Sequence, residues 1–253
     1  MITDVHTRRL VVLSDLHLGN PFSSVRRRTV EFLDWAAREG IDICLNGDGF
    51  EVAQVSFARL TQDVPEVLRA LKNAHARGSR VYYVVGNHDI VFEHFLSDWG
   101  FLRLAPFLNV RSGVARIRVE HGHLYDPFFV AYPRLYDFCT WLGGLALKIS
   151  PGLYRQWIRF EKLRGRSFSR CGTSGISGEP ASFYAAASNL EARGFDGVVF
   201  GHTHHAGQSS LPLGGRYLNP GSWMLGSKYV YIDDGVIELR EYRSSREGAM
   251  RAG

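Results

Sequence analysis

Five short segments of the chain contain side chains of the types that bind divalent metal ions in proteins. In chain order they are Ser14-Asp15-Leu16-His17, Asn46-Gly47-Asp48, Gly86-Asn87-His88-Asp89, His121-Gly122-His123 and Gly201-His202-Thr203-His204. Together they supply about seven hard or borderline ligands, enough for two ions that share one carboxylate. Two ions about 3.5–4 Å apart are a known catalytic device for displacement at phosphoesters. The ordered set therefore predicts dinuclear phosphoester chemistry.

The spacing inside two of these segments lets paired side chains reach one ion. Asp15 and His17 are two residues apart, and so are His202 and His204. In extended backbone this separation puts both side chains on one face. Asp48 follows a glycine at the end of an apolar run, so its carboxylate can stand clear of a sheet and bridge two ions. Ligation by Asp, Asn and His without thiolate suits Mn²⁺, Fe or Zn²⁺ without selecting among them, and we expect Mn²⁺ first.

Apolar runs typical of buried strands precede the ligand segments. The runs are Leu10–Leu13, Ile41–Leu45, Arg80–Val85, Val114–Glu120 and Val198–Phe200. Helices are predicted over Val25–Arg38 and Gln62–Arg77, each followed by a glycine. This strand–helix alternation predicts parallel strands with right-handed crossovers.

Near the C-terminus, Tyr229–Ile232 and Val236–Glu241 flank an Asp-Gly step that suits a β-hairpin. We therefore expect an α/β architecture with two packed sheets and helices outside them. The ligand groups then lie beyond the C-terminal ends of strands, where α/β sheets gather their sites.

Length and composition limit the class of protein and the partners that it can have. A chain of 253 residues with 45% hydrophobic and 22% charged residues can form one globular domain with a full core. The net charge of +5 favours anionic partners, which include phosphorylated substrates, nucleic acid and anionic lipid. Cys44, Cys139 and Cys171 form neither a CxxC pair nor a disulfide framework, which fits a reducing compartment. Met1–Leu13 lacks the apolar stretch of a secretory signal, and no apolar run reaches the roughly 20 residues that span a bilayer.

The roughly 70 residues between His121 and Phe195 are not required by the strand pattern. Tyr132–Leu147 and Leu153–Leu163 are predicted helices rich in aromatic residues, and basic residues follow closely. The Gly/Ser-rich segment Cys171–Pro180 predicts a mobile connection. The aromatic side chains either pack these helices on the core or contact an apolar ligand, and both interpretations stay open.

The five segments resemble the calcineurin-like metallophosphoesterase superfamily, whose pattern is D-x-H, GD, GNH[DE], a later H and GHxH. The pattern is complete here. The resemblance implies a four-layer αββα sandwich that forms a single domain over residues 1–253. It implies that one ion is held by Asp15, His17, Asp48 and His204, and that a second is held by Asp48, Asn87, His121 and His202.

The same resemblance implies catalytic roles for His88 and Asp48. His88 would protonate or stabilise the leaving oxygen, while the metals activate a water and neutralise the phosphate oxygens. Asp89 is expected to orient a ligand and not to bind metal. A superfamily member that has lost catalysis and acts as a binding module is the alternative of another class. Such members usually lose ligand histidines, and none is missing here.

A narrower resemblance covers most of the chain. Gly47–Glu51, Tyr82–Asp89, the basic insert and Gly201–His204 look like the UDP-2,3-diacylglucosamine hydrolases, peripheral membrane enzymes of lipid A synthesis that release UMP and the acylated sugar 1-phosphate. That likeness implies a helical cap at about residues 124–180 that holds acyl chains. It implies a phosphorylated lipid or nucleotide-sugar lipid as substrate, an anionic membrane surface as partner and no nucleic acid. The expected location is cytoplasmic, with peripheral binding to the cytoplasmic face of the inner membrane. The candidate substrate contacts are Asp126, Arg159, Arg164, Arg166 and Arg170.

The chain departs from that narrower family in two places. His88 stands where the best-known members carry arginine, and Leu218–Trp223 looks more like the Asn-Pro-Gly-Ser turn of other superfamily phosphodiesterases. Both departures leave the metal chemistry intact. The alternative function within the superfamily is therefore a soluble nucleotide or phospholipid phosphodiesterase or phosphatase. Acyl specificity and oligomeric state have no signal in the sequence.

Overall fold

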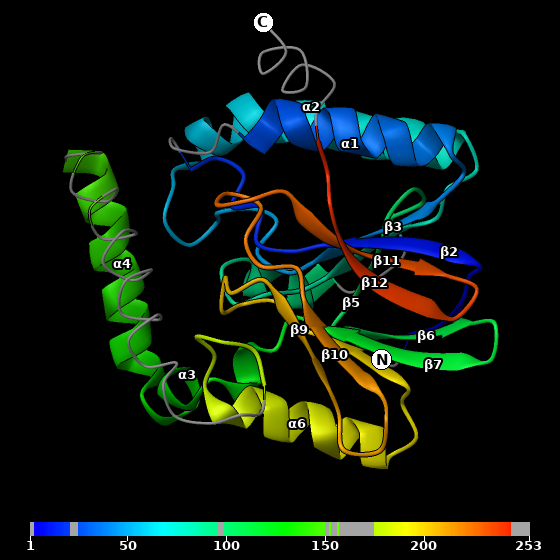
Figure 1. Cartoon of the computed structure of the whole chain (residues 1–253). Coiled ribbons are helices and arrows are strands. Elements are labelled where there is room, and N and C mark those ends of the chain that lie inside the picture. Colours follow the sequence, from blue (N-terminus) through cyan, green and yellow to red (C-terminus); the bar gives the residue numbers. More distant parts are fainter. Residues whose placement is uncertain are drawn as a thin grey trace, which may run out of the picture.

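The computed structural model describes residues 3–20, 25–95, 99–149, 152, 156 and 175–243. In this part of the chain the strands form two six-stranded sheets, with the orders β12-β11-β2-β3-β4-β5 and β1-β6-β7-β8-β10-β9. The sheets pack face to face, with α1 and α2 outside one of them and α6 outside the other (Figure 1). The predicted αββα layering is therefore confirmed.

The bounds of the elements follow the apolar runs closely. The first sheet contains β2 (Arg9–Leu13), β3 (Asp42–Asn46), β4 (Val81–Val84), β5 (Arg103–Ala105), β11 (Lys228–Asp233) and β12 (Val236–Glu241). The second contains β1 (Thr3–His6), β6 (Phe107–Ser112), β7 (Ala115–Glu120), β8 (Gly197–Val199), β9 (Gly207–Ser210) and β10 (Arg216–Asn219). The helices are α1 (Val25–Arg38), α2 (Phe57–Ala76), α3 (Pro127–Ala131), α4 (Pro133–Ile149) and α6 (Ala181–Ala192), with 3₁₀ turns η1 (Ile90–Phe95) and η2 (His123–Tyr125).

Strand β2 is buried on both faces, as expected for a central strand. Val11 and Leu13 pack toward α1 and α2, whereas Leu10 and Val12 face the second sheet. Successive side chains of a strand point to opposite faces, so one apolar run serves two cores. Each fully buried Val or Leu side chain contributes about 1.5–3 kcal/mol relative to exposure. These two cores hold β2 and its parallel neighbours β3, β4 and β5 in place.

Helices α1 and α2, which lie outside the first sheet, are close to the positions predicted from the sequence. Helix α1 has the predicted bounds Val25–Arg38 and is followed by Gly40 at φ 62°. Helix α2 begins at Phe57, five residues before the predicted start at Gln62. Pro65 lies inside this helix, and a proline normally favours the first turn. The prediction for α2 was therefore too short.

Helix α6, which the sequence analysis did not predict, adds part of the stretch between His121 and Phe195 to the core. Phe183, Ala187 and Leu190 are buried against the second sheet and form a third apolar cluster with Tyr217. The helix is rich in Ala and Ser, so it carries no broad apolar stripe that the sequence could reveal. The expectation of a mobile segment is wrong for residues 175–180, because Ile176 is buried in the same cluster. Cys171 lies outside the described residues.

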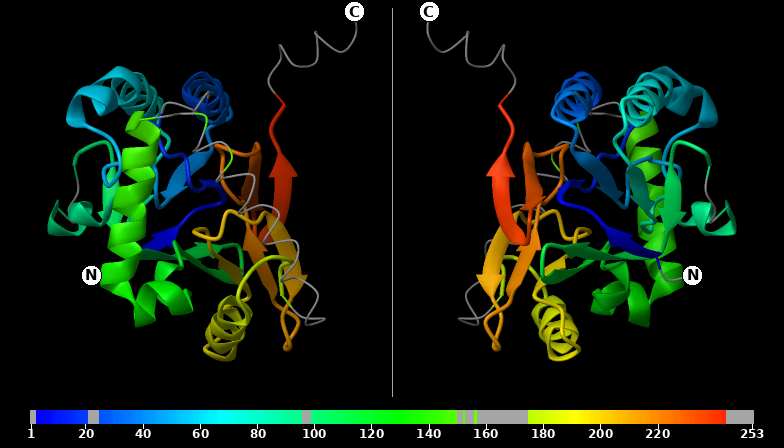
Figure 2. Two further views of the ribbon diagram at one scale, coloured as in Figure 1. Left: turned by 90° about the vertical axis from the view of Figure 1, so that its left-hand side faces the viewer. Right: turned by 90° about the vertical axis from the view of Figure 1, so that its right-hand side faces the viewer.

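Helices α3 and α4 extend from the end of β7 and stand along one side of the sandwich (Figure 2). Apolar side chains of this pair remain at least one-third exposed: Phe128, Val130, Leu135, Phe138, Trp141, Leu142 and Leu145. In the described residues no helix combines the length and apolar character needed to cross a membrane. The predicted helix Leu153–Leu163 lies almost wholly outside the described residues.

Leu190→Ala should destabilise the whole sandwich, because it opens a cavity between α6 and the second sheet. The expected loss is about 2–5 kcal/mol in the free energy of unfolding, measured by urea denaturation. Leu213→Ala, at a side chain that is 75% exposed, is the control and should change stability by no more than about 0.5 kcal/mol. A loss for Leu190→Ala as small as that of the control would show that α6 is not part of the cooperative core.

Candidate metal centre

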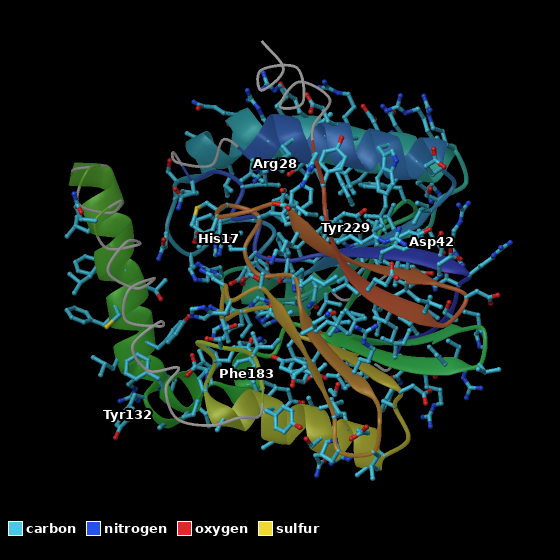
Figure 3. All side chains as sticks on the ribbon, viewed as in Figure 1. His17, Arg28, Asp42, Tyr132, Phe183 and Tyr229 are labelled. Atoms are coloured by element: carbon cyan, nitrogen blue, oxygen red, sulfur yellow. The ribbon has the colours of Figure 1, made fainter. Side chains whose placement is uncertain are left out.

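The ligand segments meet at one edge of the sandwich because each follows a strand that ends there. Asp15, Asp48 and Asn87 follow the parallel strands β2, β3 and β4. His121 and His202 follow β7 and β8, which are also parallel to each other. Carboxyl ends of parallel strands meet at one sheet edge, and stacking the two sheets brings the two sets together. Figure 3 shows the neighbouring His17 on the side of the sandwich that faces α4.

The backbone at these positions is unusual. In the described part of the chain six residues other than glycine have positive φ, and five of them are predicted ligands with φ between 45° and 67°. These five are Asp15, His17, Asp48, His202 and His204. A left-handed residue other than glycine costs about 1–2 kcal/mol, so such residues persist only where the surroundings determine them. Strain concentrated at these side chains marks the region as a functional site.

Two motif glycines make room for ligands of other motifs. A Cβ atom on Gly47 would lie 2.2 Å from Nδ1 of His121. A Cβ atom on Gly86 would lie 2.3 Å from Oδ1 of Asp48. Neither approach is possible for a larger residue without displacing the ligand, so each glycine is a steric requirement of the assembled centre.

Asp15, His17 and His204 form a group that could hold an ion, with one ligand atom of each within 4.8 Å of the others. Nε2 of His17 lies 3.1 Å from Nε2 of His204, and the latter lies 3.3 Å from Oδ1 of Asp15. Oδ1 of Asp15 is buried, and no donor of the described residues reaches it in hydrogen-bonding geometry. A buried carboxylate oxygen without a donor fits a bound cation.

Asp48, His121 and His202 form a second such group. Nδ1 of His121 donates to the backbone carbonyl of Asn46 at 3.0 Å, so Nε2 is the atom that offers a lone pair when the ring is neutral. That Nε2 lies 3.1 Å from Oδ1 of Asn87 and 3.3 Å from Oδ2 of Asp48. Three acceptors face one another, and a divalent cation between them would satisfy all three.

Glu51 joins the two halves of the site and was missed as a functional residue. Its Oε2 accepts from Nδ1 of His17 at 2.6 Å, and its Oε1 accepts from Nδ1 of His88 at 2.5 Å. Burial acts to raise the pKa of Glu51, but the two histidine rings outweigh it and hold the pKa at about 2. The only sequence signal was its place three residues after Asp48 in a quoted motif.

His88 lies beside the ligand groups and is held at two atoms. Its backbone N–H donates to Oδ1 of Asp48 at 2.8 Å. Burial acts to lower the pKa of His88, but the carboxylates of Glu51 and Asp48 outweigh it and raise the pKa to about 10. A ring held in this way is protonated at neutral pH, and its Nε2 is the atom not engaged by Glu51.

Asp89 holds two ligand loops together. Its Oδ2 accepts from the backbone N–H of Gly49 at 3.0 Å and from the hydroxyl of Tyr83, and its Oδ1 accepts from the N–H of Gly86 at 2.7 Å. The loops that carry Asp48 and Asn87 are therefore tied to one buried carboxylate. This geometry agrees with an orienting role.

Glu179 is a second residue that the sequence did not reveal. It accepts hydrogen bonds from Thr203 at 2.7 Å, from Tyr217 at 2.6 Å and from Asn219 at 2.7 Å. Thr203 lies between the candidate ligands His202 and His204, so this hydrogen-bond network holds the loop that carries them. Burial raises the pKa of Glu179 to about 7, although the three hydrogen bonds act against the rise.

Of the five residues predicted to contact the substrate, the structure describes only Asp126. Asp126 lies at the second group, where its Oδ2 is 2.9 Å from Nε2 of His202. Its Oδ1 accepts from the backbone N–H of Phe128 at 2.8 Å and caps α3. The four arginines, Arg159, Arg164, Arg166 and Arg170, lie outside the described residues.

Comparison with known proteins agrees with this geometry. The family model described as calcineurin-like phosphoesterase matches residues 8–206. UDP-2,3-diacylglucosamine hydrolase from Azotobacter vinelandii is 26% identical over 242 residues, covering 92% of this chain and 98% of that protein. The enzyme of the same name from Coxiella burnetii is 24% identical over 247 residues, covering 93% and 98%. A dimetal phosphatase from Danio rerio superimposes with a TM-score of 0.47 at 11% identity, covering 92% of this chain and 95% of that structure.

The chain belongs to the calcineurin-like phosphoesterase family, because the family model spans most of it. It is accordingly a metal-dependent phosphoester hydrolase, and the groups around Asp15 and Asp48 are its candidate metal-binding groups.

Glu179→Gln should flatten the dependence of stability on pH. The carboxyl has a pKa of 4.5 in its ordinary state and about 7 in the folded protein, so the folded protein binds its proton more tightly. The free energy of unfolding of the wild type therefore falls as pH rises from 4.5 to 7, by about 3 kcal/mol. Urea denaturation in chelator at pH 5 and pH 8 should show this fall in the wild type and a smaller one in the variant. An equal fall in both would contradict the buried, proton-binding role of Glu179.

Proposed function

We propose that the protein is a dinuclear-metal hydrolase of a lipid-linked phosphoester. The leading substrate is UDP-2,3-diacylglucosamine, whose diphosphate would be cleaved to UMP and 2,3-diacylglucosamine 1-phosphate. The observation that carries the proposal is the pair of ligand groups centred on Asp15 and Asp48, with an apolar helix pair standing beside them. The similarity to UDP-2,3-diacylglucosamine hydrolases over nearly the whole chain supports the choice of substrate.

In this proposal Asp48 is shared between the two ions, and the residue types at the site suit Mn²⁺, Fe or Zn²⁺. The first ion would be held by Asp15, His17, Asp48 and His204, and the second by Asp48, Asn87, His121 and His202. When bound, the two ions would supply an activated water and neutralise the phosphate oxygens.

His88 and Glu51 would act on the leaving group. Glu51 fixes Nδ1 of His88, so Nε2 would hold the proton that the departing oxygen needs. The carboxylate of Glu51 favours the protonated ring, which would also stabilise negative charge that develops on the leaving oxygen. A cationic histidine would thereby supply the positive charge that arginine supplies in the best-known relatives.

The apolar face of α4 would meet the acyl chains or the lipid surface. Phe138 and Trp141 are more than half exposed, and their rings stack with centroids 6.0 Å apart. Aromatic and aliphatic side chains on one helix favour insertion at the boundary of a bilayer. A peripheral position on the cytoplasmic face of the inner membrane would follow from such contact.

The basic run Arg26-Arg27-Arg28 contributes less to this membrane contact. Arg26 pairs with Glu66 at 3.3 Å and Arg27 pairs with Glu31 at 3.6 Å. Arg28 donates to the backbone carbonyl of Trp223. These internal partners favour the interpretation of the run as a helix face that serves the fold.

A soluble nucleotide or phospholipid phosphodiesterase is the second candidate. It is favoured by His88 in place of arginine and by the Asn219-Pro220-Gly221-Ser222 turn. In that turn the side-chain oxygen of Asn219 accepts from the N–H of Gly221 at 2.8 Å, and Ser222 donates to the carbonyl of Asp15 at 2.9 Å. The turn thus supports a ligand loop whichever ester is bound.

Asp48→Asn should abolish metal-dependent turnover. The change removes the shared negative charge, so the expected loss exceeds the about 100-fold typical of outer-sphere partners. Purified protein with Mn²⁺ would be assayed on UDP-2,3-diacylglucosamine, bis-p-nitrophenyl phosphate and cyclic nucleotides, with and without chelator. Asp234→Asn is the matched control, because Asp234 also has positive φ (46°) but lies in the β11–β12 turn. Turnover that survives both Asp48→Asn and chelation would rule out the dinuclear mechanism.

The double variant Phe138→Ser and Trp141→Ser should separate the two candidate functions. If acyl chains of the bound substrate cover Phe138 and Trp141, the variant loses both of these apolar contacts. KM for the diacyl substrate should then rise about 10-fold or more. Turnover of bis-p-nitrophenyl phosphate should stay unchanged. Leu213→Ser with Val236→Ser is the control, because both side chains are exposed and lie outside α3 and α4. Leu213 is between β9 and β10, and Val236 begins β12. Equal effects on both substrates would favour the soluble phosphodiesterase.

A further inference from the structure

Two candidate ligand side chains of the second group, His202 and Asn87, have a hydrogen-bond partner at the start of α3 or in α4 in addition to their contacts with the sandwich. Nε2 of His202 lies 2.9 Å from Oδ2 of Asp126, which begins α3. The side-chain amide of Asn87 donates to the hydroxyl of Tyr136 on α4 at 3.0 Å. By contrast, His17 of the first group is held by Glu51 from the sandwich.

Asp126 determines which nitrogen of His202 can bind an ion. A carboxylate accepts, so Nε2 of His202 carries the proton and Nδ1 carries the lone pair. Nδ1 lies 2.8 Å from Oδ1 of Asn87, inside the second group. Asp126 itself is fixed, because its other oxygen caps α3 at Phe128. The ring of His202 is further enclosed by Phe183, which stacks on it at an interplanar angle of 7°.

Tyr136 determines which way the amide of Asn87 points. Its hydroxyl oxygen accepts from the amide nitrogen, so the amide oxygen faces His121 at 3.1 Å and His202 at 2.8 Å. An amide turned by 180° would present N–H groups to those rings and could not bind a cation. Tyr136 is half-buried, so this contact is partly shielded from water.

A third contact fixes α4 to the loop that follows Asp48. The side-chain amide of Gln54 donates to the backbone carbonyl of Thr140 at 3.2 Å. Tyr136 and Thr140 are one helical turn apart, so α4 is attached to the ligand loops along one face. The insert is therefore joined to the loops after β3, β4 and β8.

We propose that α3 and α4 complete the second metal site, with Asp126 and Tyr136 as positioning residues for His202 and Asn87. The inference rests on the proposed function, since it takes His202 and Asn87 as ligands. The insert then contributes to retention of one ion as well as to substrate contact. By linkage, an ion at this site and the docking of α4 stabilise each other.

The test is metal binding by Tyr136→Phe and Asp126→Asn. Metal-free wild type and variants would be titrated with Mn²⁺ by calorimetry, and the loaded proteins would be compared by electron paramagnetic resonance. In both variants we expect the second equivalent to bind about 10–100-fold more weakly, with the first equivalent unchanged. The spectrum should change from that of a coupled pair to that of a single ion. Asp126→Ala should weaken the second equivalent more than Asp126→Asn, whose amide oxygen can still accept from His202.

Tyr132→Phe is the matched control, because it removes a hydroxyl from an exposed tyrosine at the end of α3. Its titration should match that of the wild type, and thermal unfolding in chelator should be the same for all the tyrosine variants. Two ions bound with wild-type affinities in both Tyr136→Phe and Asp126→Asn would overturn the inference while leaving the proposed function intact. A wild type that binds no second ion would instead overturn the proposed function.

Discussion

Lone pairs that face one another are the constraint on which this structure depends. Nε2 of His121 lies 3.1 Å from Oδ1 of Asn87 and 3.3 Å from Oδ2 of Asp48, and all three atoms are acceptors when the ring is in the neutral form that binds metal. Such an arrangement is unfavourable unless a positive charge is shared. The opposed strand ends, the tight glycine contacts and the buried carboxylates all serve to hold these acceptors together against their repulsion. A bound cation, or a proton on His121, relieves this repulsion.

The apolar cores of the sandwich stabilise the fold and so offset the unfavourable clustering of acceptors at the candidate metal centre. Apolar side chains fill three layers, and β2 contributes to two of them through Leu13 and Val12. The left-handed residues, in contrast, gather in the loops at one edge. Rigid strands and strained loops are thus separate parts of the same chain. The helices α3 and α4 are a third part, because polar contacts join them to the loops that carry the candidate ligands, and seven of their described apolar side chains are at least one-third exposed.

The sequence predicts the strands well because their signals are local, and it places the candidate ligands at the ends of these strands. Each ligand follows an apolar run within a few residues, and glycine marks the turn. The roles of Glu51 and Glu179 could not be predicted, since a contact such as Glu179 with Asn219 joins residues 40 positions apart. Helix α6 was missed because alanine and serine give a weak pattern, although tertiary packing buries one face of it. The assignment of ions to individual ligands, and the roles of the arginines that follow α4, stay predictions.

The steric fit of Gly86 against Asp48 has a consequence for how such chains diverge. Oδ1 of Asp48 occupies space that a Cβ on Gly86 would need, so Asp48 keeps its position only while residue 86 is glycine. A Cβ on Gly86 would also lie 2.5 Å from the backbone N of Asp48, so the glycine is required whatever side chain stands at position 48, whereas a larger residue at position 86 would displace Asp48. Gly47 likewise leaves space for His121, and its φ of 77° favours glycine independently of that contact. Replacement of either glycine would therefore damage a candidate ligand in a different segment, so the second, third and fourth segments are sterically dependent on one another.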